Sequence, residues 1–106
     1  MASASFPRIA TVCRSARRSA QYSQSDVASL MGWKNAQFIS NIERGLCSLP
    51  SKYLGKYCEL LGIPLGEAIE AMVEDYRASL WQAAGSEAPA PKLYTVPPMG
   101  MDGEAV

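Results

Sequence analysis

Apolar residues recur three and four residues apart in five separate segments of this chain. The first segment predicts a helix that begins near Pro7 and ends in the polar run 19–22. One face of this helix carries four apolar residues: Ile9, Val12, Cys13 and Ala16. The same spacing predicts helices over 24–31, 36–44, 51–61 and 64–83. No segment alternates as a strand does. The pattern therefore predicts an all-α fold of five helices, of which the fifth is extended.

Residues that start or stop helices stand at the expected boundaries. Ser23 and Asn35 precede the second and third helices as caps. A glycine, which readily takes the left-handed conformation, follows three of the helices: Gly32, Gly45 and Gly62. The second helix is expected to turn three larger residues inward: Val27, Leu30 and Met31. One side of the fifth helix carries Leu65, Ala68, Ile69, Met72, Val73, Tyr76 and Leu80, and its acid lies in Glu67, Glu70, Glu74 and Asp75.

The charge is unevenly distributed along the 106 residues, although the net charge is zero. Residues 1–66 carry eight basic and three acidic residues, whereas residues 67–106 carry two basic and seven acidic residues. A basic half beside an acidic half suggests a polyanionic partner, although a small surface must also carry its charge somewhere. Charge alone leaves both interpretations open.

The composition changes after Ala84. Residues 85–106 contain four prolines and three glycines, so we expect a Pro-rich C-terminal tail behind a single domain over 1–84. The tail also carries scattered apolar residues: Leu93, Tyr94, Val96, Met99 and Met101. They leave two interpretations open, a flexible tail and a segment that docks on the domain or on a protein partner.

Several function classes lack the residues they need. The chain has no histidine, which removes the commonest general base and metal ligand. Its three cysteines match no zinc spacing, and Cys13 and Cys58 fall at apolar helical positions, as small core residues do. No apolar run approaches the ~20 residues of a membrane span. We therefore expect no enzyme, no metal, no cofactor and no membrane contact.

The second and third helices, joined at Gly32, have the features of a helix-turn-helix unit over 24–44. Small Ala28 lets the two helices cross closely, and Ile39 and Ile42 anchor the second of them to the core. The free face of that helix then presents short polar side chains, as a helix in the DNA major groove does.

Over about residues 6–73 the chain resembles the lambda-repressor-like family, the Cro-type or xenobiotic-response-element helix-turn-helix proteins. The stretch that carries the resemblance is Ser23-Gln24…Ala28…Gly32…Ile39-Ser40-Asn41-Ile42-Glu43-Arg44-Gly45…Pro50-Ser51…Leu60-Leu61-Gly62-Ile63. The segment from Ile39 to Gly45 is its most specific part. The resemblance implies a DNA-binding domain whose recognition helix spans about 36–44.

The resemblance also assigns roles to individual residues. It implies DNA base contacts from Gln37, Asn41 and Ala36, and amide side chains can pair bidentately with adenine. It implies phosphate contacts from Gln24, Lys34, Asn35 and Arg44. Arg17 and Glu43 match a buried ion pair of the family. Trp33 is expected to pack at the turn rather than stack on DNA.

Two departures from the family pattern affect these assignments. Ile39 follows Gly32 by seven positions, where the family usually has six, so the turn is one residue longer and the start of the recognition helix is open. Gln21 stands where the family has a glycine after its first helix, and we therefore expect a different turn geometry there.

Together these observations predict a sequence-specific transcriptional regulator, a dimeric repressor that reads a palindromic operator in double-stranded DNA. Dimerisation is expected through the region 65–96, with Met72, Tyr76, Leu80 and Trp81 as the contact residues. A cytoplasmic, prokaryotic or phage-encoded protein fits this role. The alternative is an antitoxin or adaptor on the same fold, which would bind a protein partner through its tail.

Overall fold

The computed structural model describes residues 5–86, which form five α-helices and no strand. The helices are α1 (Pro7–Ser19), α2 (Gln24–Met31), α3 (Gln37–Glu43), α4 (Ser51–Leu61) and α5 (Leu65–Ala83). This confirms the predicted all-α, five-helix fold with an extended fifth helix. The residues 87–106 of the predicted tail lie outside the described part of the chain.

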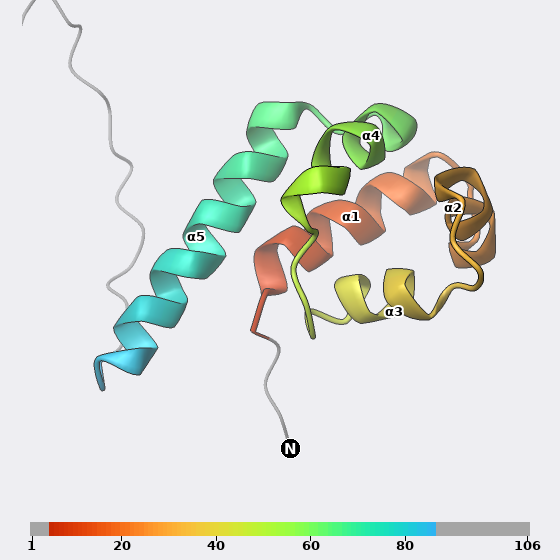
Figure 1. The fold of residues 1–106 in the computed structure, drawn as a ribbon. Coiled ribbons are helices and arrows are strands. Elements are labelled where there is room, and N and C mark those ends of the chain that lie inside the picture. The colour runs from red at the N-terminus through yellow and green to blue at the C-terminus, as the bar shows by residue number, and fades with distance from the viewer. Residues whose placement is uncertain (1–4, 87–106) are drawn as a thin grey trace, which may run out of the picture.

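Helix α1 is the centre of the fold and packs against α3, α4 and α5 (Figure 1). Helix α2 closes one end of the domain by packing on α3 and α4. The core is built from side chains that are almost fully buried, among them Ile9, Cys13, Val27, Ile39, Ile42, Leu49 and Tyr57. Cys13 and Cys58 are buried, as predicted, and burial raises the pKa of the Cys13 thiol to about 12.

The turn between α1 and α2 contains a residue in the left-handed conformation that glycine favours, although that residue is not a glycine. Gln21 has φ of 64°, the only non-glycine residue in the left-handed region among residues 5–86. The N–H groups of Gln21 and Tyr22 bond back to the carbonyls of Arg18 and Arg17, at 3.0 and 3.2 Å. The expectation of a different turn geometry was therefore wrong, because Gln21 takes the left-handed conformation that a glycine at this position would favour. For a residue with a side chain this conformation has a steric cost of about 1–2 kcal/mol.

Helix α2 has strong signals at both ends. Ser23 and Asp26 form a reciprocal capping box, in which the Ser23 hydroxyl accepts from the Asp26 N–H at 3.0 Å. Gly32 ends the helix in the left-handed conformation, with φ of 80°. The inner stripe differs from the prediction, because Ala28 is buried whereas Leu30 remains 44% exposed.

The buried side of helix α5 shares Ala68 with the side that the sequence suggested but turns most of its larger residues outward. Ala68 and Ala71 are buried, while the larger residues expected to line the inner side stay exposed: Leu65, Ile69, Val73, Tyr76 and Leu80. The small alanine side chains let α5 approach α1 closely, which bulkier residues at these positions would prevent. A continuous apolar face of α5 is thus left without a partner within the described chain.

Candidate functional site

Helix α3 presents a polar face that the remainder of the domain holds in place. Ile39 and Ile42 are fully buried, and Glu43 is 3% exposed, so one side of α3 is fixed in the core. Gln37 is exposed and Asn41 half-buried on the opposite side. The helix is one residue shorter at each end than predicted, because Ala36 and Arg44 are its caps.

The longer turn before α3 is accommodated by local bonds and aromatic packing. The Trp33 N–H bonds to the Ala28 carbonyl at 2.8 Å, and the Asn35 side chain accepts from the Gln37 N–H at 2.9 Å. Asn35 thus caps the first turn from one residue before Ala36. The Trp33 ring packs edge-on against Phe38 and Tyr53, with ring centroids 4.9 and 5.2 Å apart. Trp33 therefore belongs to the packing of the turn, as expected.

The two amides on the outer face of α3 are bonded to each other. The Gln37 Nε2 atom donates to Asn41 Oδ1 at 3.0 Å, one helical turn apart. This bond leaves the carbonyl oxygen of Gln37 and the amino group of Asn41 free. The pair therefore offers both an acceptor and donors to the edge of a base. Ala36, half-buried at the start of α3, offers only an apolar contact.

A buried ion pair fixes α3 to α1. Arg17 Nε lies 2.6 Å from Glu43 Oε2, and Arg17 Nη2 lies 2.9 Å from Glu43 Oε1, a bidentate arrangement. The Arg17 guanidinium also donates to the Tyr22 carbonyl at 2.9 Å. The hydrogen bond to Glu43 raises the pKa of Arg17 above its ordinary value. Arg17 and Glu43 thus occupy the relation that the resemblance implied, at the rear of the polar face.

Gln24, assigned to a phosphate, is engaged within the protein. Its Nε2 donates to Glu43 Oε1 at 3.1 Å, so its amide extends the ion pair toward the start of α2. The second N–H of that amide remains available. Arg44 and Lys34, the cations assigned to phosphates, are both exposed beside α3.

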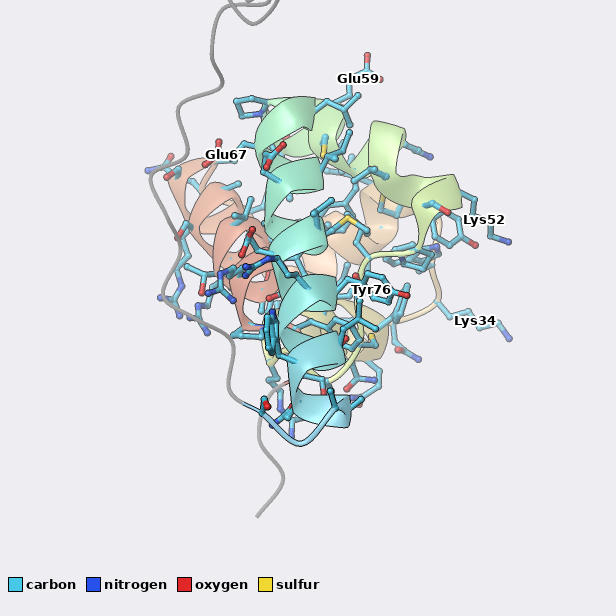
Figure 2. All side chains as sticks on the ribbon, turned by 90° about the vertical axis from the view of Figure 1, so that its left-hand side faces the viewer. Lys34, Lys52, Glu59, Glu67 and Tyr76 are labelled. Carbon is cyan, nitrogen blue, oxygen red and sulfur yellow. The ribbon has the colours of Figure 1, made fainter. Side chains whose placement is uncertain are left out.

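Lys52 is a further cation that the sequence reasoning did not single out. It is exposed in the first turn of α4, and Figure 2 shows Lys34 and Lys52 projecting on the same side of the molecule. Each lysine is next in the chain to an aromatic residue of the packed turn, Lys34 to Trp33 and Lys52 to Tyr53. The sequence signal that could have pointed to Lys52 is its position directly after Pro50–Ser51, at the start of a predicted helix. No side chain caps that helix start in the structure.

The residues assigned to dimerisation lie on α5, which faces the viewer in Figure 2. Tyr76 is 65% exposed and Leu80 52%, whereas Met72 is half-buried. A hollow of about 280 Å³ is lined by Leu54, Ile69, Met72, Val73 and Tyr76. A second hollow, of about 250 Å³, is lined by Arg77, Leu80, Trp81 and Ala84. Trp81 thus borders the second hollow and not the first.

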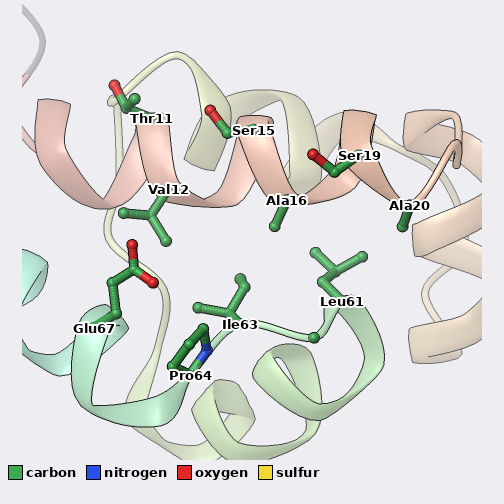
Figure 3. A pocket seen from close by; sticks show the side chains of 11 residues that line it. Thr11, Val12, Ser15, Ala16, Ser19, Ala20, Leu61, Ile63, Pro64 and Glu67 are labelled. Atoms are coloured by element: carbon green, nitrogen blue, oxygen red, sulfur yellow. The ribbon is translucent and has the colours of Figure 1, made fainter.

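A third hollow, of about 530 Å³, lies between α1 and the turn that joins α4 to α5 (Figure 3). Its lining consists mainly of small and hydroxyl side chains of α1, facing Leu61, Ile63 and Pro64. No lining residue belongs to α2 or α3, so this hollow is separate from the polar face.

Residues 5–86 lack two further features that would point to other functions. No helix there has the length and apolar character needed to cross a membrane. That part of the chain likewise holds no cluster of three or more acidic or cysteine side chains placed to share a metal ion.

Comparison with known proteins gives one result. The sequence model of the helix-turn-helix family matches residues 14–67, just over half of the chain. The match covers the second half of α1, from residue 14, all of α2, α3 and α4, and the start of α5. Neither a curated protein nor a solved structure matches the chain significantly.

Proposed function

The chain belongs to the helix-turn-helix family of Cro/C1 type, and from this we propose that it is a dimeric, sequence-specific repressor that reads DNA with α3. The family supports a DNA-binding regulator. The observation that carries the finer proposal is the polar face of α3, where Gln37 and Asn41 stand outward while Ile39 and Ile42 are fully buried.

Direct readout rests on the bonded amides. A bidentate amide contact needs one donor and one acceptor that face the same base, and adenine offers N7 and its N6 amino group in the major groove. The bond between Gln37 and Asn41 orients both amides before DNA arrives, which reduces the entropy lost on binding. Ala36, at the start of α3, contacts a thymine methyl group or a sugar.

Phosphate contacts surround this reading face. Lys34 and Arg44 flank the two ends of α3, and both are exposed. Lys52 joins them from the start of α4, whose free N–H groups also favour an anion. Asn35 and the free N–H of Gln24 contribute neutral bonds to the backbone. These contacts fix the position of the domain on the duplex without reading sequence.

A dimer supplies the specificity that one helix of seven residues lacks. The exposed apolar face of α5 supports this assembly, since such faces mark interaction sites on soluble domains. In the proposed dimer, Ile69, Met72, Val73 and Tyr76 of one copy pack against the same residues of the other, with Leu80 and Trp81 beyond them. Two copies then present two α3 helices to half-sites about one helical turn, ~34 Å, apart. A dimer seated in this way blocks the access of RNA polymerase to a promoter.

Selection of binding sites from random double-stranded DNA tests the proposal. We expect a palindrome, and affinity that falls ~10³–10⁵-fold between 50 and 200 mM salt if the dimer neutralises six to ten phosphates. Gln37→Ala should relax the preference at one position of each half-site, whereas Arg44→Ala should weaken binding to all sequences alike. Recovery of no enriched site, together with monomeric sedimentation at tens of micromolar, would refute the proposal.

A further inference from the structure

Asp75 is a buried carboxylate that joins two elements with different roles in the proposed function. It is 1% exposed and projects from α5 into the start of α1. Its Oδ1 and Oδ2 atoms accept hydrogen bonds from the N–H groups of Arg8 and Ile9, both at 3.0 Å. The Arg8 guanidinium lies 3.8 Å from Oδ1 and partly neutralises the charge. In the sequence Asp75 is only one of the acidic residues of this helix, with no sign of its burial.

Helix α1 depends on this distant carboxylate because it has no cap of its own. Its N-cap residue is Phe6, which makes no side-chain cap bond, and its first turn contains no acid. Asp75 supplies both the acceptor and the negative charge that a helix start favours. The cap thus comes from a residue more than sixty positions away, so α5 and α1 are held in one relative position.

The two residues directly before α1 are bonded to the residue that follows the C-cap of α3. The N–H groups of Ser5 and Phe6 both donate to the Gly45 carbonyl, at 2.9 and 3.1 Å. Gly45 follows directly after Arg44, the C-cap of α3. Hydrogen bonds therefore run from α5 through Asp75 to the start of α1, and from there to the end of the helix that reads DNA.

We propose that Asp75 is a positioning residue that sets the spacing between the two reading helices of the dimer. The proposal rests on the function proposed above, because α5 forms the dimer interface there. If α5 is fixed to α1 and α1 to α3, then the two α3 helices stand at one distance and one angle. If the link through Asp75 loosens, each domain can pivot on α5, and half-sites with several spacings become acceptable.

The test measures the affinity of the full chain for palindromic DNA. In one duplex the half-sites have the selected spacing, and in two others they are one base pair, ~3.4 Å of rise, closer or farther apart. For the wild type we expect ~10²-fold higher affinity at the selected spacing than at the altered ones, because two linked binding sites gain such a factor only when both engage at once. For Asp75→Ala we expect this affinity ratio to be roughly tenfold smaller. Asp75→Asn keeps one carbonyl acceptor and should lie between the two. Glu74→Ala is the matched control, because its only described partner is the exposed Arg77 at 3.9 Å, and it should discriminate as the wild type does.

A second measurement requires no DNA. Amide hydrogen exchange at Arg8 and Ile9 should accelerate in Asp75→Asn, and exchange at Phe6, which is bonded to Gly45, should accelerate with it. Unchanged exchange at Phe6 and undiminished spacing discrimination in a folded Asp75→Ala dimer would overturn the proposal. Failure of the proposed function gives a different result, in which the wild type itself binds no palindrome or does not dimerise.

Discussion

The ion pair between Arg17 and Glu43 gives the most quantitative prediction. The Arg17 side chain is 11% exposed and the Glu43 side chain 2%, so neither charge has enough water to replace its partner. Removal of one partner from such a pair costs about 3–5 kcal/mol. A domain of this size is stable by only about 5–15 kcal/mol, so either single change should remove a large part of the stability.

Replacement of both partners should cost much less. In Arg17→Met with Glu43→Leu no charge of the pair remains buried. The groups that lose a hydrogen bond are the backbone carbonyl of Tyr22 and the side-chain amide of Gln24, both in half-buried residues that water can reach. We expect the double variant to lie within about 1 kcal/mol of the wild type, because apolar residues of similar size often replace a buried pair without loss. The coupling free energy between the two positions, the sum of the single losses minus the loss of the double variant, is then about 5 kcal/mol or more.

Urea unfolding followed by far-UV circular dichroism measures this cycle. The exposed pair of Glu74 and Arg77, 3.9 Å apart, is the control cycle and should give a coupling of about 0–1 kcal/mol. If a single variant at Arg17 or Glu43 does not fold, the cycle can be run in a background stabilised by Gln21→Gly. A double variant that loses the sum of the two single losses would refute the assignment of Arg17 and Glu43 as a coupled buried pair.

Three further predictions concern stability. Gln21→Gly should stabilise the domain by about 1 kcal/mol and raise Tm by roughly 4–8 °C, because glycine relieves the left-handed strain at φ of 64°; an unchanged or lower Tm in calorimetry would contradict this. Tyr57→Phe should leave the free energy of unfolding unchanged or raise it by about 1–2 kcal/mol, because the buried hydroxyl has no hydrogen-bond partner within residues 5–86, and a clear loss in urea titration would disprove it. The Ser23 N–H and hydroxyl lower the pKa of Asp26 in the folded protein below its ordinary 3.8. The stability from this cap is therefore fully present above the unfolded pKa and is lost as pH falls through the lower pKa of the folded state. Asp26→Asn should therefore flatten the acid limb of the stability profile, and an identical limb in both proteins would exclude this contribution.

The local patterns of the sequence were sufficient for the helices and for the outer face of α3. Apolar spacing located all five helices, and the burial of Ile39 and Ile42 follows from the same spacing that turns Gln37 and Asn41 outward. Ser23 and Gly32 marked the ends of α2 because their effects depend only on neighbouring residues.

The features that the sequence did not predict depend on contacts between distant segments. Asp75 looks like one more acid of α5 until the start of α1, more than sixty residues away, supplies its two N–H partners. The buried side of α5 is set by how closely α1 approaches, which favours Ala68 and Ala71 over the larger residues beside them. Gln21 has no local preference for a left-handed conformation, so its own residue type did not signal the φ of 64° that it adopts.

The central claim is that Gln37 and Asn41 touch base edges in the major groove, and a chemical change to the DNA tests it most directly. Replacement of each adenine of the selected site by 7-deazaadenine removes the N7 acceptor and leaves base pairing intact. At one adenine of each half-site we expect the wild type to lose about 1–3 kcal/mol of binding free energy. The variant that lacks the contacting amide, Gln37→Ala or Asn41→Ala, should lose no more on this replacement. Equal losses in the wild type and in both variants, or no loss at any adenine, would contradict the account.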